Sequence, residues 1–187
     1  MELMLRLITL IVFVISLSAL PFASAQTVKE NQALGRIHNR ITAHYPELSH
    51  VSAEEMMALT ETQDVILFDV RENKEYAISH IDGALRVDPN ISTDEFMSRY
   101  GETVRGKQVV LYCSVGRRSS KLGDRVRADL IESGAKSVSN LEGGIFRWHN
   151  QHRPLRQGDV ATQKVHPYNR WWARLIARKD HIAYAPE

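Results

Sequence analysis

Apolar residues gather in short runs along the chain, and amphipathic stretches separate these runs. Two continuous apolar runs, residues 65–70 and 108–112, have the length of strands, as is typical of strands buried on both faces of a sheet. Shorter strands are predicted near residues 50–51, 84–87 and 136–141, and helices at residues 28–45, 52–59, 73–79, 92–100, 119–133 and from 145 toward Pro154. Strands and helices therefore alternate, which predicts an α/β domain with helices on both faces of a mainly parallel sheet.

The first 25 residues have the order of a secretory signal peptide. A short head precedes the apolar run 7–20, Pro21 interrupts it, and Ala23-Ser24-Ala25 offers small residues for cleavage. We expect cleavage after Ala25 and an exported protein, periplasmic or secreted. The alternative is a membrane anchor that stays attached, for which the apolar run is short against the roughly 20 residues of a membrane span.

Composition and charge argue against nucleic-acid binding, an intramolecular disulfide and a metal site. Of the 187 residues, 24 are Lys or Arg and 22 are Asp or Glu, so the net charge of +2 gives no reason to expect a nucleic-acid partner. The chain has one cysteine, which excludes an intramolecular disulfide and a zinc site built of several cysteines. His149 and His152 lack a third ligand nearby in the sequence, so no metal site is predicted.

The loop from Cys113 to Ser119 is the best candidate for chemistry. Cys113 follows a buried strand and precedes a helix, so it lies at the edge where ligands bind in parallel sheets. Unpaired amides and the helix dipole favour a thiolate there, and we expect a lowered pKa in a partly exposed side chain. Gly116 allows the loop to curl, while Arg117 and Arg118 add positive charge. The alternative is a structural cysteine beside two solvated arginines.

Five short motifs occur in an order that resembles the rhodanese family of sulfurtransferases. These motifs are Asp69-Val70-Arg71, Glu75-Tyr76, His80 to Ala84, Tyr112 to Ser119, and Leu141 to Ile145 followed by Trp148 and Pro154. The resemblance implies a five-stranded parallel sheet and a Cys113 that carries sulfur. It also implies that loop groups bind the substrate, with Asp69, Arg71 and Arg118 bracing the loop. The loop residues concerned are Ser114, Val115, Gly116, Arg117, Arg118 and Ser119.

Two details of the loop bear on its chemistry. Family members that use thiosulfate often carry Arg or Lys after the cysteine, whereas this chain has Ser114, which places efficient use of that dianion in question. Phosphatases that share the fold need five residues between Cys and Arg. Ser119 occupies that position here, and Arg118 follows after only four residues, which disfavours phosphatase or arsenate reductase activity.

The sequence thus predicts a sulfurtransferase that moves sulfane sulfur from a donor, such as thiosulfate or a persulfide, to a thiol or cyanide through a Cys113 persulfide, without a cofactor. The alternative is a non-catalytic binding module for a partner protein or an anion. The rhodanese-like domain is expected at residues 49–154, after a helical segment at 26–48. The tail, 155–187, is expected to begin as a loop and to continue as a basic, Trp-containing helix at 167–179. This helix either packs on its own domain or contacts a membrane surface or a protein.

Overall fold

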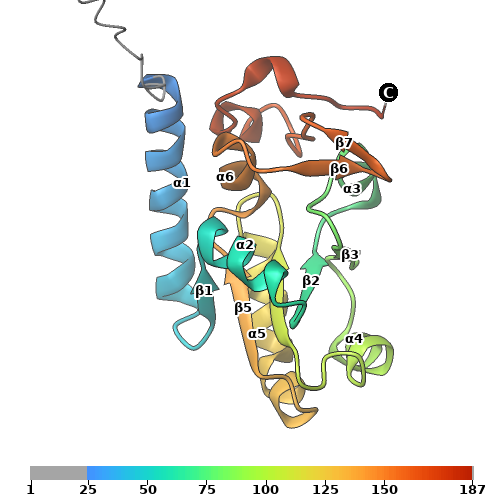
Figure 1. Cartoon of the computed structure of the whole chain (residues 1–187). Helices are drawn as coiled ribbons and strands as arrows, with labels where there is room; N and C mark the ends of the chain where they lie inside the picture. The colour runs from blue at the N-terminus through green and yellow to red at the C-terminus, as the bar shows by residue number, and fades with distance from the viewer. Residues whose placement is uncertain (1–24, 187) are drawn as a thin grey trace, which may run out of the picture.

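The computed structural model describes residues 25–186 (Figure 1). The predicted signal peptide lies outside the described residues except for its last residue, Ala25. Within residues 25–186, no helix is both long and apolar enough to cross a membrane.

A five-stranded parallel sheet forms the centre of the domain, as predicted. Its strands are β1 (Ser49–Val51), β2 (Val65–Asp69), β3 (Leu85–Arg86), β4 (Gln108–Tyr112) and β5 (Ser137–Leu141), in the order β1-β5-β4-β2-β3. Each neighbouring pair is parallel. The carboxyl ends of the strands therefore meet at one edge, where the loop after β4 begins.

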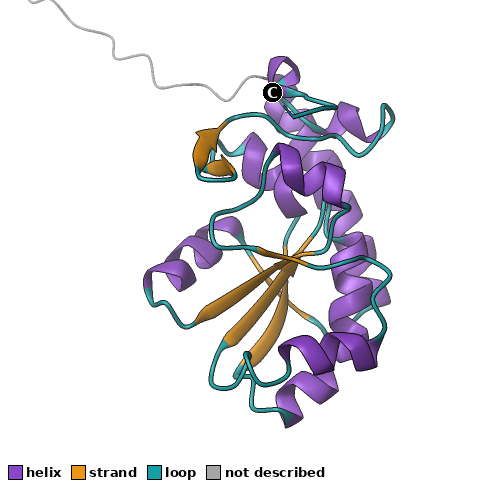
Figure 2. Cartoon of the chain, turned by 90° about the vertical axis from the view of Figure 1, so that its right-hand side faces the viewer, coloured by secondary structure: helices purple, strands orange, loops and turns teal. Residues whose placement is uncertain are grey.

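Helices cover both faces of this sheet (Figure 2). One core contains residues of α1 (Ala25–His44), α2 (Ala53–Glu61) and α6 (Gly144–Asn150), and the other contains residues of α4 (Thr93–Tyr100) and α5 (Arg117–Glu132). Alternating residues of β4 supply both cores, since Val110 and Tyr112 join the first while Val109 and Leu111 join the second. Both faces of β4 are apolar for this reason.

The helices begin where local hydrogen bonds allow it. Ser52 and Glu55 form a capping box at α2, while at α4 the Ser92 hydroxyl accepts a bond from the Glu95 amide. The helix α5 starts two residues earlier than predicted because Gly116, at φ 93°, ends the preceding loop. A residue with a side chain rarely adopts this conformation.

The C-terminal tail differs from its predicted form. Residues 155–165 contain a hairpin of β6 (Leu155–Gln157) and β7 (Val160–Thr162), turned by Gly158 and the following Asp159. A Gly-Asp pair between short strands is a recognised hairpin signal, which the prediction of a loop overlooked. The hairpin lies beside α3 (Asn73–Ile78), and Arg156 exchanges two backbone hydrogen bonds with His80 (Figure 1).

The prediction of a helix at residues 167–179 is wrong. Residues 167–181 contain only two short 3₁₀ helices, η1 (Trp172–Leu175) and η2 (Lys179–His181), because the backbone becomes extended at Ile176. The Lys179 ammonium donates to the carbonyls of Ala173 and Arg174, at 3.1 and 3.0 Å, and so caps η1. The segment packs on its own domain, with Leu175 and Ile176 buried and Asn150 of α6 bonded to the backbone at Leu175 and Ala177.

Candidate active site: the loop after β4

Cys113 begins the loop and is buried, with 1% of its surface exposed, so the expectation of a partly exposed thiol is wrong. The side chain belongs to the core that α4 and α5 cover, while a second helix N-terminus, that of α6, holds the backbone of the loop. The Ile145 amide donates to the Cys113 carbonyl at 2.9 Å, and the Phe146 amide donates to the Ser114 carbonyl at 3.1 Å. The first amides of α6 therefore fix the backbone at the start of the loop.

Gly144 makes this close approach feasible. It has φ 56°, and a Cβ placed on it would lie 2.3 Å from the Cys113 carbonyl oxygen and 2.9 Å from that of Ser114. No side chain fits at such distances, so Gly144 allows α6 to pack directly against the backbone of the cysteine loop.

The Cys113 thiol lies in a polar cradle that favours its ionised form. Burial opposes ionisation, yet the positive charge of Arg118, hydrogen bonds from the hydroxyl and amide of Ser119, and the amide of Val115 together bring the pKa below its usual value. The charges act on each other, since the ionised thiol also raises the pKa of the Arg118 guanidinium. The sequence predicted this direction for the pKa and the use of loop amides.

Ser119 is itself hydrogen-bonded to Asn140 of β5. The Ser119 hydroxyl lies 2.6 Å from the Asn140 Oδ1 atom, and both residues are fully buried. The amide group of Asn140 donates in turn to the Leu141 carbonyl at 3.2 Å. Asn140 thus orients a hydroxyl whose single proton has two acceptors within reach, the amide oxygen and the thiolate.

Glu75 of α3 is a site residue that the sequence analysis did not select. Its carboxylate accepts two bonds from Arg118, at 2.8 and 2.9 Å, and one from the Ser114 hydroxyl at 2.8 Å. Burial opposes its charge, but Arg118 and Arg71 keep its pKa below the usual value. The available sequence signal was the Glu75-Tyr76 pair, noted only as a family marker.

Ser114 is part of this network. It is buried, accepts a bond from Arg118 at 3.0 Å and donates to Glu75. Its hydroxyl therefore positions Arg118, and only 5% of the residue is exposed to meet a donor.

The two arginines of the loop have different surroundings. Arg118 acts on the thiol, whereas Arg117 is exposed and lines a hollow between α1 and Trp172. The expectation that both arginines stabilise the thiolate is therefore met by Arg118, and Arg117 faces a different surface.

Asp69 and Arg71 act on the loop through α3. Both are fully buried and form an ion pair of 2.6 Å, and the Tyr112 hydroxyl donates to Asp69 at 2.7 Å. Arg71 also donates to the Ser79 carbonyl at 2.5 Å, at the end of α3. This ion pair anchors α3, which contains Glu75. Because Glu75 binds Arg118, the ion pair helps to position Arg118 indirectly.

The C-terminal tail covers part of the site. The Arg118 guanidinium lies 4.8 Å from the centre of the Tyr168 ring, within the range of a cation–π contact. Tyr168 adopts φ 67° and its amide donates to the buried His166 ring at 3.0 Å. Burial lowers the pKa of His166, while nearby Glu75 opposes this shift. The C-terminal tail thus packs the Tyr168 ring against the Arg118 guanidinium.

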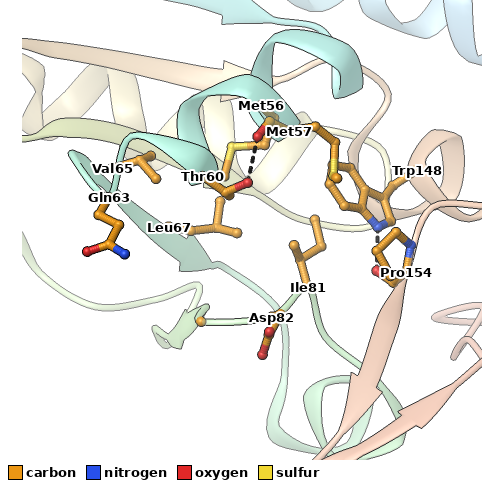
Figure 3. Close-up of a pocket in the computed structure, with 11 residues that line it drawn as sticks. Met56, Met57, Thr60, Gln63, Val65, Leu67, Ile81, Asp82, Trp148 and Pro154 are labelled. Carbon is orange, nitrogen blue, oxygen red and sulfur yellow. Dashed lines mark hydrogen bonds between the residues drawn. The ribbon is translucent and has the colours of Figure 1, made fainter.

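A separate cavity of about 560 Å³ lies under α2 (Figure 3). Its lining includes Met56, Leu67, Ile81 and Trp148, and none of its lining residues belongs to the cysteine loop. The cavity therefore lies apart from the cysteine loop, and both apolar and polar side chains line it.

Between residues 25 and 186, no three His, Cys, Asp or Glu side chains are arranged to hold a metal ion. His149 is buried instead and hydrogen-bonds the Gln163 carbonyl at 3.0 Å, and burial lowers its pKa to about 4.

Comparison with known proteins agrees with this geometry. Residues 52–151 match the family described as Rhodanese-like domain. A tRNA uridine(34) hydroxylase of Bacillus cereus is 23% identical over 149 residues, which are 79% of this chain and 45% of that protein. The enzyme of the same name from Oceanobacillus iheyensis is 27% identical over 124 residues, 65% of this chain and 36% of that protein. The chain therefore spans less than half the length of these relatives.

The fold is also found in solved structures. A thiosulfate sulfurtransferase from Pseudomonas aeruginosa superposes with a TM-score of 0.50 at 21% identity, covering 76% of this chain and 26% of that one. At this identity the likeness concerns the fold alone. The family match covers more than half of the chain and includes the cysteine loop, so the chain belongs to the rhodanese-like domain family.

Proposed function

We propose that the protein is a sulfurtransferase in which Cys113 carries sulfur as a persulfide. The observation that carries the proposal is the cradle around the only cysteine, in which Arg118, Ser119 and Val115 lower the pKa of a buried thiol. A buried cysteine without such partners has a raised pKa and is inert.

In the first half-reaction, the Cys113 thiolate attacks the sulfane sulfur of a donor. With thiosulfate, a bond forms between the two sulfurs, the sulfur–sulfur bond of the donor breaks, and sulfite leaves with the electron pair. The enzyme then holds a persulfide anion, so the total negative charge is unchanged. The cradle that favours the thiolate also favours this anion, because amides and a cation interact with either.

In the second half-reaction, a thiolate or cyanide attacks the outer sulfur of the persulfide. That sulfur leaves as a new persulfide or as thiocyanate, and the Cys113 thiolate is restored. Since the two substrates react in turn with one nucleophile, ping-pong kinetics are expected. Neither step needs a metal or an organic cofactor.

The rival function is a binding module that keeps the fold and transfers no sulfur. One observation favours it, namely that Cys113 is only 1% exposed. A donor therefore reaches the thiol only if the cysteine loop or the C-terminal tail moves. The two functions differ in turnover. We therefore expect the purified protein, supplied with thiosulfate or a small organic persulfide and with cyanide, to release thiocyanate.

The matched control for this assay is Cys113→Ser, which retains the size of the side chain and loses the nucleophile. Release by the unmodified protein and none by the variant is the expected result. Equal release by both proteins, or none by either with every donor tried, would favour the binding module.

We further propose that the protein acts outside the cytoplasm, on the strength of the apolar run 7–20 and the Ala-Ser-Ala sequence that follows. Intact-mass measurement of the exported protein is expected to show an N-terminus at Gln26. A mass that retains residues 1–25 in a membrane fraction would contradict the proposed cleavage.

A further inference from the structure

A groove runs between α1 and the C-terminal segment, and it ends at the cysteine loop. It consists of two adjoining hollows of about 740 and 390 Å³, which share Ile37, Arg40 and Trp172. We call it the α1–tail groove. Its first hollow extends along α1 to Lys29, and its second is lined by Arg117 at the start of α5. Apart from Arg117, the lining residues lie outside residues 52–151, the region that matches the family.

The groove carries unpaired positive charge. Arg36 and Arg40 of α1 and Arg117 of the loop are exposed, and none of them forms an ion pair with a described residue. One acid, Glu30, occurs among the described lining residues, and it lies 3.6 Å from the Lys179 ammonium. An anionic ligand would therefore meet cations without displacing a carboxylate from them.

The floor of the groove is apolar, whereas the charges lie on its rims. Ala33, Ile37 and Trp172 are half-buried and Leu175 is buried, while the arginines of α1 are exposed. The residues on this side of α1 recur at helical spacing from Lys29 to His44, about 22 Å along the axis at 1.5 Å per residue. This length matches six or seven residues of an extended chain, at about 3.3 Å each.

We infer that the α1–tail groove binds an acidic, extended segment of a partner polypeptide in which carboxylates alternate with apolar side chains. An extended chain turns alternate side chains to opposite sides, so apolar groups fit the floor while carboxylates reach the rims. A flat lipid surface does not enter a concave groove. A single-stranded nucleic acid needs open aromatic faces for its bases, and Arg174 lies over one face of Trp171, 3.2 Å from the ring centre.

The position of Arg117 connects this groove with the proposed function. Gly116, next to it, lies close to Ile41 of α1, since a Cβ on Gly116 would be 3.6 Å from the Ile41 Cδ1 atom. A peptide in the groove would thus end beside the cysteine loop. The purpose we assign to it, presenting the thiol or persulfide of a partner protein to Cys113, rests on the proposed sulfurtransferase function, whereas binding itself does not.

Peptide binding tests the inference directly. The probe is a fluorescein-labelled octapeptide of alternating Glu and Leu, titrated with the mature chain carrying Cys113→Ser so that no sulfur chemistry intervenes. The test variant is Arg36→Gln with Arg40→Gln. The control is Gln32→Glu with Asn39→Asp, which lowers the net charge equally at exposed positions of α1 outside the groove.

We expect saturable binding that weakens about tenfold in the test variant, falls with added salt, and changes little in the control. Quenching of tryptophan emission by an unlabelled peptide gives a second readout at Trp171 and Trp172. Absence of binding, or equal weakening in both variants, would overturn the inference. Tighter binding of phosphatidylglycerol vesicles or of an oligothymidylate, lost in the same test variant, would overturn the choice of occupant. A protein that binds the peptide and transfers no sulfur would keep the groove and refute the proposed function.

Discussion

Replacing Arg118 tests how a buried thiol is kept ionised. The guanidinium charge stabilises the ionised form of the Cys113 thiol, so Arg118→Met is expected to raise the pKa of the thiol. A charge-assisted interaction of this kind contributes about 1.5–3 kcal/mol. Because 24% of the Arg118 side chain is exposed, the lower value applies, and about 1.5 kcal/mol corresponds to a rise of about one pKa unit.

The single variant has a second effect that must be separated from the first. Without Arg118, the Glu75 carboxylate remains buried without the cation it now binds twice, and leaving one partner of a buried ion pair costs about 3 kcal/mol of stability. The double variant Glu75→Gln with Arg118→Met removes both charges. It is expected to recover much of the lost stability while the pKa of Cys113 stays raised.

The assay is the rate of alkylation by iodoacetamide against pH, read by mass. Since the chain has one cysteine, no second thiol reacts. The midpoint of the rate profile is expected to lie about one unit higher in the double variant than in the unmodified protein. An unchanged midpoint in a folded double variant would refute the reasoning and assign the thiolate to the amides alone.

Three further substitutions test other parts of the account. Gly144→Ala should destabilise the protein by more than about 3 kcal/mol in urea denaturation, whereas Gly158→Ala, at the same φ of 56° but with no atom near its Cβ, should cost about 1 kcal/mol. Asp69→Asn should cost about 3–5 kcal/mol because it strands a buried guanidinium, while Glu95→Gln, in an exposed pair, should cost under about 0.5 kcal/mol. His149, whose pKa falls to about 4 in the folded protein, should contribute about 2 kcal/mol to the loss of stability from pH 8 to pH 5, and His149→Gln should remove that share of the loss.

Each of these comparisons has an outcome that contradicts it. Equal losses for the two glycine variants would show that the approach of Gly144 to the loop carbonyls is unimportant. Equal losses for the two acid variants would remove the case for a buried support beneath α3. The His149 prediction has a definite sign: burial favours the neutral ring, so stability is present above the unfolded pKa of about 6.5 and is lost as the pH falls toward 4. A His149→Gln variant that loses as much stability from pH 8 to pH 5 as the unmodified protein would contradict it.

The sequence was sufficient for those parts of the site that depend on neighbouring residues. The apolar run of β4 placed Cys113 at the carboxyl edge of the sheet, and Gly116 marked the point where the loop curls, at which the structure has a positive φ. The following helix then supplied the amides and the cation that lower the pKa of the thiol. These relations span a few residues, so the pattern and chemistry of the segment itself determine them.

The sequence did not identify contacts between distant segments. Glu75 lies 39 positions before Ser114, and no periodic pattern links a residue of α3 to the loop after β4. The backbone of the Cys113 loop is likewise held by amides of α6, which follow in sequence only after another helix and strand. Such contacts follow from the packing of the whole domain, and one sequence contains no signal of their partners.

The predicted helix in the C-terminal tail failed for a different reason. The spacing of Trp171, Trp172, Leu175 and Ile176 matches a helical stripe, but only η1 forms. Leu175 and Ile176 are buried against the domain instead, and Asn150 takes up hydrogen bonds that a longer helix would have used within itself. Tertiary packing overrides a weak local periodicity here, as it does for many short segments.

The most direct test of the central claim is the mass of the protein after mixing with a sulfane donor. Cys113 is the only cysteine, so a persulfide there adds the mass of one sulfur atom to the chain. We expect this addition in the unmodified protein, its loss on treatment with cyanide, and none in Cys113→Ser. A folded protein that gains no sulfur from thiosulfate or from organic persulfides would contradict the account.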